Sequence, residues 1–207
     1  MQMKNSGRLI LTFVAILAVA AFASDEAPEK DQAPKLEIGT KVGQRLPHFR
    51  AELQDVSKEK PGKTAFDSHE NEQATAFVFM SRTCPYCRMY QDRLAAMSKD
   101  FAAKGVRFVM VYPTRATPES QKIAYHKEAG FGAPLINDKD ASIAAALKVT
   151  KTPEIVLVTK QGEIVFRGGI DDSPQSSEKV AKPFLKNACD DVAAGRKVRV
   201  TSAPLYG

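Results

Sequence analysis

Two short apolar runs in the middle of the chain have the pattern of buried β-strands. The first, ATAFVFM at 74–80, and the second, VRFVMVY at 106–112, are rich in aromatic and β-branched residues. Between them, apolar residues recur at spacings of four, three and four: Tyr90, Leu94, Met97 and Phe101. This spacing predicts one face of an amphipathic helix that ends near Gly105. A strand, a helix and a strand of these lengths form a βαβ unit, so the sequence predicts a pair of parallel strands.

The pattern after residue 112 predicts three further helices and a β-hairpin. The helices are expected at 117–130, 139–147 and 183–194. Asp140 is the expected N-cap of the second of them. The runs EIVLV and EIVFRG flank the turn sequence TKQG, which predicts a hairpin over 154–168. Residues 39–54 combine turn residues with spaced apolar positions, so they are expected to be a loop that leads into the core. The polar, poorly patterned residues 55–74 are also expected to be loop.

The first 23 residues have the composition of a secretory signal peptide. Lys4 and Arg8 form a positive n-region, residues 9–20 form an apolar stretch, and Ala21-Phe22-Ala23 has the form of a cleavage site. The alternative is an uncleaved membrane anchor, but the 15 residues from 9 to 23 fall short of the ~20 that a membrane-spanning helix needs. We therefore expect an exported, periplasmic or otherwise secreted protein whose mature form has no stable membrane span, in a compartment where disulfides persist.

Length and composition favour one folded domain. Residues 24–40 begin with a charged stretch that carries two prolines, and we expect them to be a flexible leader. The remainder, 41–207, is long enough for one sizeable core. The net charge of +6 falls to +4 once Lys4 and Arg8 are removed, and no dense basic block is interleaved with aromatic residues. Nucleic acid is therefore not an expected partner.

The stretch SRTCPYCRMY at 81–90 contains the candidate chemistry. It places Cys84 and Cys87 three residues apart, and the chain has only one further cysteine, Cys189. A structural zinc site normally needs four ligands, and neither Cys189 nor the three histidines supply a second close pair, so no metal is expected. A structural disulfide across two residues would close a very small loop and remove little chain entropy. These arguments favour a redox pair.

The position of each cysteine suggests its role. Cys84 falls where the strand at 74–80 gives way to a helix, and Pro85 suits the first turn of that helix. The helix N-terminus, together with Arg82 and Arg88, favours thiolate over thiol at Cys84. Cys87, one turn later, is expected to be more buried and to resolve the mixed disulfide. Cys189 lies on the apolar face of the last predicted helix, as a core cysteine would.

The second informative stretch is KTPE at 151–154, where Pro153 opens an apolar strand. A cis Thr152–Pro153 bond would expose the backbone of Thr152 for pairing with a substrate peptide. The alternative is an ordinary trans proline in a turn, which the residues alone favour.

Three segments of the chain, in their order and spacing, resemble the thioredoxin superfamily, in its exported TlpA-like or redoxin branch. They are VGQRLPHF, FVFMSRTCPYCRMY and VTKTPEIVLVTKQGEIVFRGGIDD, and the resemblance runs from about Val42 to Val200. It implies an α/β thioredoxin fold, with a central mixed β-sheet flanked by helices. It also implies a thiol–disulfide oxidoreductase with Cys84 as the attacking thiol, Cys87 as the resolving thiol and Pro153 as a cis-proline. The implied partners are protein thiols and disulfides and a redox partner protein, with no cofactor.

Some positions depart from the family pattern and leave alternatives open. Arg82-Thr83 stands where thioredoxins commonly carry a tryptophan, so the redox direction is not determined. Ser81 lies three residues before Cys84, as in peroxiredoxins, but Phe77 replaces the proline expected four residues earlier. A thiol peroxidase is therefore one alternative. Another is a copper-binding chaperone that uses the two thiolates, although no methionine or histidine cluster supports it.

Glu154 is a further candidate because the resemblance places its neighbour Pro153 beside the cysteines. A carboxylate close to the thiols would disfavour thiolate and could relay protons to the buried cysteine. The alternative is an exposed residue at the start of a strand.

Overall fold

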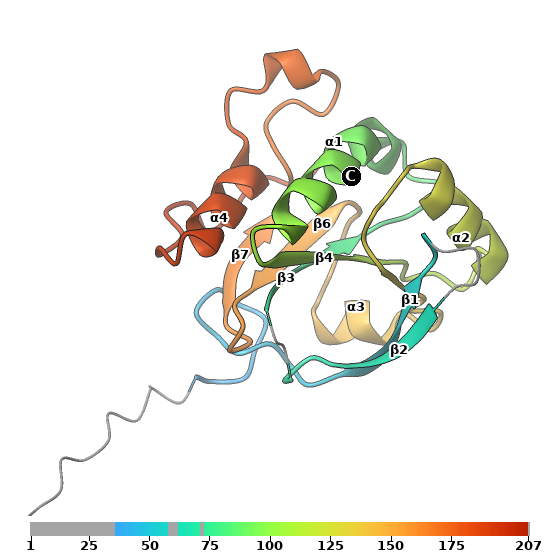
Figure 1. The fold of residues 1–207 in the computed structure, drawn as a ribbon, viewed down its shortest axis with the longest axis horizontal. Helices are drawn as coiled ribbons and strands as arrows, with labels where there is room; N and C mark the ends of the chain where they lie inside the picture. The colour runs from blue at the N-terminus through green and yellow to red at the C-terminus, as the bar shows by residue number, and fades with distance from the viewer. Residues whose placement is uncertain (1–35, 58–61, 71–72, 207) are drawn as a thin grey trace, which may run out of the picture. The chain divides into compact units, whose positions relative to one another are not determined.

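The computed structural model describes residues 36–57, 62–70 and 73–206. Its strands form one seven-stranded sheet (Figure 1). The strands are β1 (Arg50–Asp55), β2 (Gly62–Asp67), β3 (Ala74–Phe79), β4 (Val106–Val111), β5 (Leu135–Ile136), β6 (Glu154–Val158) and β7 (Ile164–Gly168). The helices are α1 (Pro85–Ala102), α2 (Glu119–Glu128), α3 (Ser142–Ala146) and α4 (Phe184–Ala193), with a short 3₁₀-helix at Ser177–Lys179.

The sheet is mixed, as the thioredoxin fold requires. The strand order is β2-β1-β5-β4-β3-β6-β7. β3 pairs in parallel with β4, and β4 with β5, whereas the remaining neighbours are antiparallel. β3, α1 and β4 form the predicted βαβ unit, with Ala74 opposite Val106. β6 and β7 form the predicted hairpin, and Gly162 in its turn has a φ of 81°, which glycine adopts without strain.

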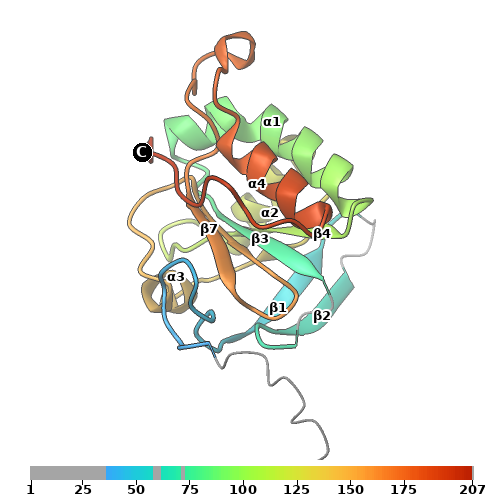
Figure 2. The same cartoon turned by 90° about the vertical axis from the view of Figure 1, so that its left-hand side faces the viewer.

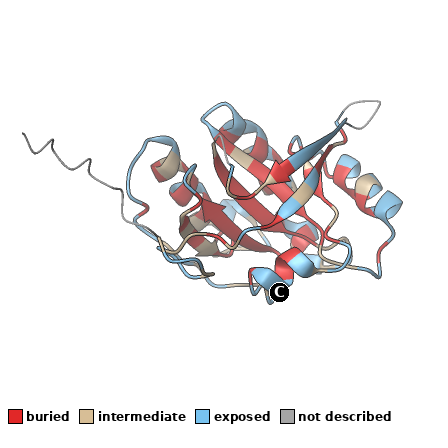
Figure 3. Cartoon of the chain, turned by 90° about the horizontal axis from the view of Figure 1, so that it is seen from below, coloured by how far each residue is buried: buried red, intermediate tan, exposed pale blue. Residues whose placement is uncertain are grey.

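The two faces of the sheet pack against different elements. Val78 and Met80 belong to a core cluster that includes residues of α1 and α4 and Tyr125 of α2. Their neighbours in the strand, such as Phe77, belong to a second cluster that includes residues of α3 and of the segment leading into β1. This division follows from the alternation of side chains along a strand. The views in Figures 2 and 3 show α1 and α4 on one face and the buried centre of the sheet.

The prediction of loop over 55–74 was wrong because β2 forms within it. β2 pairs along its whole length with β1, and Phe66 packs its ring near those of Phe49 and Phe77, with centroids 5.9 and 5.8 Å away. One buried aromatic residue and a neighbouring strand are enough to order a segment whose first four residues are exposed. Two further strands were not predicted: β1, Arg50–Asp55, most of which lies in the segment expected to be an entry loop, and the short strand β5, Leu135–Ile136.

The predicted N-cap of α3 was also wrong. Ala141 occupies that position, with a φ of 57°. Asp138 is the residue whose carboxylate accepts hydrogen bonds from the N–H groups of Ile143 and Ala144, at 3.2 and 3.0 Å. Asp140 accepts a bond from the Ser142 hydroxyl at 2.9 Å. The left-handed residue turns the chain so that the aspartate three positions earlier reaches the free N–H groups.

None of the helices in the described part of the chain is long and apolar enough to cross a membrane. The expected signal peptide at 1–23 and most of the expected leader lie outside the described residues.

Candidate active site

Cys84 lies at the junction between β3 and α1. It is the N-cap residue of α1, with extended backbone, and Pro85 follows in the first turn. The Cys84 N–H donates to the carbonyl oxygen of Ser81 at 3.2 Å, which closes the turn after the strand. The Cys84 side chain is partly exposed. Cys84 therefore lies at the positive end of the helix dipole, with a thiol that is partly open to a substrate.

Cys87 is fully buried one helical turn later. Its sulfur accepts a hydrogen bond from the Ser81 N–H at 3.4 Å. Burial raises the pKa of the Cys87 thiol to about 12, and the Ser81 N–H opposes part of this rise. Both cysteines are free thiols in this structure. The two thiols thus differ sharply in exposure, in the direction that the sequence predicted.

The loop before β6 brings Thr152 to the first cysteine. The Cys84 thiol donates a hydrogen bond to the Thr152 carbonyl oxygen, with sulfur and oxygen 2.9 Å apart. The Thr152–Pro153 peptide is cis. The structure therefore joins the two motifs that the sequence singled out, across 68 positions of the chain.

Glu154 is buried on the other face of the sheet from the thiols. It shares its side of β6 with Val156, which belongs to the cluster around α3, whereas Cys87 belongs to the opposite cluster. Its carboxylate accepts hydrogen bonds from Arg167 Nε at 2.7 Å and from the Thr150 N–H at 3.1 Å. The proton relay remains a prediction, and these contacts favour a different role, as an anchor of the loop that carries Thr152.

Arg167, which the sequence analysis did not single out, extends this anchor. Its guanidinium also donates to the carbonyl oxygens of Thr40, at 3.0 Å, and Lys148, at 2.9 Å. One side chain therefore ties together β7, the segment before β1 and both ends of the 148–154 loop. The charged residue inside the motif EIVFRG was the available signal, because a buried arginine requires a partner.

The turn after β7 is fixed on α1. Tyr90 donates its hydroxyl to the Asp171 carboxylate at 3.1 Å, and Arg93 forms an ion pair with the same carboxylate. Arg93 also donates to the carbonyl oxygens of Ser173 and Pro174, at 2.9 and 2.6 Å. Asp171 lies in the last of the three quoted segments, whereas Arg93 lies three residues beyond the cysteine motif, and neither was predicted as a site residue.

The C-terminal segment passes beside the active site. It crosses next to β7 toward the start of α1 (Figure 2), and Arg167 donates its N–H to the Thr201 carbonyl oxygen at 3.0 Å. A Cβ atom at Gly169 would overlap the Pro204 carbonyl oxygen, so the close approach requires glycine there. At the end of the segment, the Tyr206 ring lies 6.4 Å from that of Tyr86, which is inside the cysteine motif.

Cys189 lies in the core, as predicted. It is fully buried on α4, and burial raises the pKa of its thiol. Within the described residues, no group of three or more His, Cys, Asp or Glu side chains is placed to hold a metal ion.

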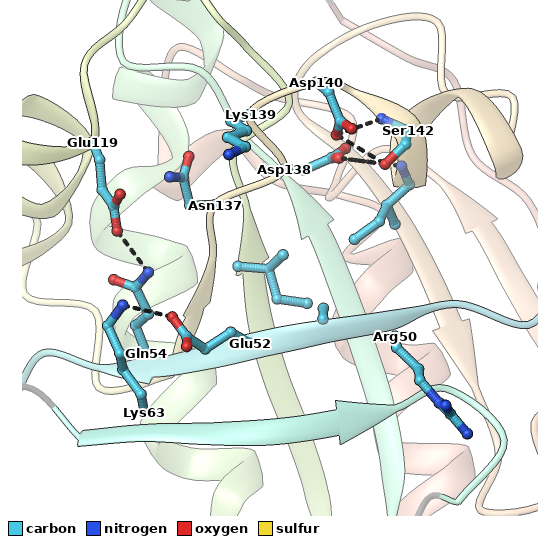
Figure 4. Close-up of a pocket in the computed structure, with 13 residues that line it drawn as sticks. Arg50, Glu52, Gln54, Lys63, Glu119, Asn137, Asp138, Lys139, Asp140 and Ser142 are labelled. Carbon is cyan, nitrogen blue, oxygen red and sulfur yellow. Dashed lines mark hydrogen bonds and ion pairs between the residues drawn. The ribbon is translucent and has the colours of Figure 1, made fainter.

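A polar pocket elsewhere contains none of the motif residues. It lies between β1, β2 and the start of α3 (Figure 4). Some of its polar groups bond to one another: Lys63 pairs with Glu52 at 2.7 Å, and the Gln54 amide donates to Glu119 at 2.7 Å. We therefore assign the chemistry to the cysteine pair and not to this pocket.

Comparisons with known proteins give the family and the fold of the chain. A model of the family described as AhpC/TSA matches residues 42–167. No curated protein sequence matches the chain. An uncharacterized conserved protein from Geobacillus kaustophilus is similar in structure, with 24% identity, coverage of 80% of this chain and 89% of that one, and a TM-score of 0.68. A hypothetical protein from Sinorhizobium meliloti has 26% identity, coverage of 80% and 92%, and a TM-score of 0.65.

The fold also extends to a protein with a stated activity. The thioredoxin domain of a thiol-disulfide oxidoreductase from Bacteroides vulgatus has 17% identity, coverage of 62% of this chain and 89% of that one, and a TM-score of 0.51. At this identity the likeness concerns the fold.

Proposed function

Since the chain belongs to the AhpC/TSA family, we propose that it is a thiol–disulfide oxidoreductase that exchanges disulfides with protein substrates. The observation that carries the proposal is the contrast between the two thiols. Cys84 is partly exposed at a helix N-terminus, and Cys87 is fully buried one turn later. An accessible thiol that attacks and a covered thiol that resolves are what disulfide exchange needs.

The reaction balances with these two residues alone. The Cys84 thiolate attacks one sulfur of a substrate disulfide, so a mixed disulfide forms and one substrate thiolate leaves. The Cys87 thiol gives up its proton to solvent or to the departing thiolate and attacks Cys84 Sγ. The second substrate thiolate leaves. The substrate disulfide is then reduced by two electrons, and the cysteine pair is oxidised to the Cys84–Cys87 disulfide. The reverse sequence oxidises a substrate dithiol.

The Thr152 carbonyl supports this role from the other side of the site. In the dithiol form it accepts the Cys84 S–H at 2.9 Å. When Cys84 becomes a thiolate, that hydrogen bond is lost and the carbonyl is free to accept an N–H from a substrate backbone. Thr152 and Pro153 are thus the proposed substrate-binding residues.

The proposal includes an exported location. The segment at 1–23 directs the protein out of the cytoplasm, and the domain at 41–207 acts in the exported compartment. A second dithiol protein in that compartment restores the reduced cysteine pair. The proposed location rests on the n-region, the apolar stretch and the cleavage pattern of the sequence.

A thiol peroxidase is the second candidate, favoured by the family match. In that reaction Cys84 attacks a peroxide oxygen, an alcohol or water leaves, and Cys87 displaces water from the resulting sulfenic acid. The Ser81 hydroxyl, which suggested this alternative, lies 3.1 Å from the Thr83 hydroxyl, whereas the Cys84 thiol bonds to the Thr152 carbonyl oxygen.

The experiment compares Cys84→Ser and Cys87→Ser in the reduction of insulin disulfides, with hydrogen peroxide as a parallel substrate. We expect Cys84→Ser to abolish disulfide reduction and Cys87→Ser to accumulate a mixed disulfide with the substrate, detectable by mass spectrometry. Cys189→Ala is the matched control and retains turnover. Consumption of peroxide without reduction of insulin would overturn the proposal in favour of the peroxidase.

A further inference from the structure

A small cavity borders the cysteine motif on the side of α2. Its volume is about 140 Å³, and its wall comes from two arginines of the motif and one side of α2. The lining residues are Arg82, Arg88, Gln121, Ala124, Tyr125 and Glu128. Arg82 precedes Cys84 by two positions and Arg88 directly follows Cys87, so the cavity adjoins the proposed reaction centre.

The charges around the cavity favour an anion. Two guanidinium groups face one carboxylate, that of Glu128. Arg88 Nε donates to the Arg82 carbonyl oxygen at 3.3 Å, which folds the arginine back over the loop. In the described ranges 36–57, 62–70 and 73–206, no ion pair involves Arg82, Arg88 or Glu128. The positive charges are therefore not neutralised by an ion pair within that part of the chain.

Two polar atoms of the lining residues lack a hydrogen-bond partner. The Tyr125 hydroxyl and Arg82 Nε are both buried and unpartnered in the described structure, and Tyr125 as a whole is 5% exposed. A buried donor without an acceptor costs about 1–3 kcal/mol, and native proteins leave few of them. Both residues line the cavity, so an acceptor oxygen of a bound ligand would be a partner for these donors.

Tyr125 is held in place by its other contacts. Its ring packs edge-on against those of Tyr112 and Phe131, with centroids 6.3 Å away in each case. The aromatic packing thus fixes the tyrosine without using its hydroxyl. The hydroxyl is available for a ligand.

The size of the cavity determines what kind of ligand fits. Sites for whole small molecules usually measure about 300–1,000 Å³, so this cavity accommodates a single side chain. Arginine guanidinium groups, a tyrosine hydroxyl and the Gln121 amide are donors that recognise a carboxylate. A side chain that enters here belongs to the molecule whose disulfide meets Cys84.

We propose that the cavity formed by Arg82, Arg88 and Tyr125 is a subsite for an aspartate or glutamate side chain next to the reactive cysteine of the protein substrate. This inference rests on the proposed disulfide exchange, and it defines the substrate class as disulfides flanked by acidic residues.

The test uses two synthetic disulfide peptides that differ only in a glutamate or a glutamine beside the cysteine. For the full-length protein we expect kcat/KM to be about tenfold higher for the glutamate peptide, through a lower KM. Arg82→Gln and Tyr125→Phe should each reduce this ratio, and Glu128→Gln should increase it. The ratio is the readout because any effect of Arg82 on the rate of attack by Cys84 applies to both peptides equally.

Arg115→Gln, at an exposed arginine outside the cavity, is the control for net charge and should leave the ratio unchanged. Equal kcat/KM values for the two peptides, or a preference that survives Arg82→Gln and Tyr125→Phe, would overturn the subsite. Peptide binding to Cys84→Ser, measured by fluorescence anisotropy, separates the two proposals. If Cys84→Ser binds the glutamate peptide more tightly but the wild-type protein turns over neither peptide, the disulfide exchange is wrong and the subsite stands. Equal binding of the two peptides would contradict the subsite.

Discussion

Arg167 holds the Glu154 carboxylate on the face of the sheet opposite the thiols, with Nη2 and Oε1 2.6 Å apart. The two side chains are 20% and 3% exposed, so the pair is mostly shielded from water. Because Glu154 also accepts the Thr150 N–H and Arg167 donates to Lys148 O, the pair restrains the loop that presents Thr152 to Cys84.

We predict that Arg167→Met lowers the free energy of unfolding by about 3 kcal/mol, because it leaves the Glu154 carboxylate buried without its partner. Urea denaturation followed by circular dichroism measures the change. Arg50→Met is the control, since it removes an arginine that pairs with Asp67 while 79% exposed. Equal losses in the two variants would contradict the assigned importance of the buried pair.

We predict that Glu154→Gln leaves the apparent pKa values of the cysteine pair unchanged while it reduces stability. The carboxylate and the thiols lie on opposite faces of the sheet. Thiolate absorbance titrated in the wild type and in the variant is the measurement. A lower thiol pKa in the variant would instead support the proton relay, because loss of a nearby negative charge favours thiolate.

Gly169→Ala is expected to destabilise the protein by about 1–3 kcal/mol, because its Cβ would meet the Pro204 carbonyl oxygen and displace the C-terminal segment. Faster digestion by carboxypeptidase would report that displacement. Gly62→Ala is the matched control, since no atom lies within 4 Å of a Cβ built there. If Gly169→Ala behaves like Gly62→Ala, the segment is not seated as described.

Acid should destabilise the protein through His126. The histidine is fully buried and its pKa is lowered to about 4 by burial, against 6.5 for the exposed side chain. Below pH 6.5 the unfolded state therefore binds a proton, whereas the folded state binds it only below about pH 4. The contribution of His126 to the free energy of unfolding is thus fully present above pH 6.5 and decreases as the pH falls. From pH 7 to pH 5 we expect a loss of about 2 kcal/mol.

His126→Gln should remove this dependence, because glutamine does not titrate. Chemical denaturation of both proteins at pH 7, 6 and 5 measures it. The same decrease in stability in both proteins over this range would show that other groups cause it.

Cys189→Ala is expected to cost about 1 kcal/mol of stability and to leave redox turnover intact, since the thiol only fills space between α4 and the sheet. A disulfide between Cys189 and either motif cysteine, found by peptide mapping of the oxidised protein, would contradict this.

The elements with strong periodicity were predictable, and those stabilised by distant partners were not. The central strands and α1 follow from apolar runs because their burial depends on their own side chains. β2 was missed because four of its six residues are exposed and it forms through pairing with β1. Asp138 was missed as the cap of α3 because the left-handed Ala141 is not visible in the sequence pattern.

The residues of the candidate site also differ in whether the sequence could predict them. The spacing of Cys84 and Cys87 indicated their chemistry and their difference in burial, because both depend on the local turn into a helix. Tyr125, Arg167 and Tyr206 act through contacts with residues far away along the chain. The charge of Arg167 within an apolar strand was a signal, but it does not identify the partner, and nothing near Tyr125 and Tyr206 in the sequence distinguishes them from ordinary core or surface residues.

The position of the C-terminal segment has a consequence for association between copies of the protein. A sheet that ends in β2 and β7 has two edges whose backbone groups could pair with another chain. The segment near Ser202 bridges to Arg167 and covers the β7 edge, while Lys63 and Asp67 place charges on the β2 edge. Proteolytic loss of the last residues would uncover the β7 edge, and with it a route to aggregation that the intact chain blocks.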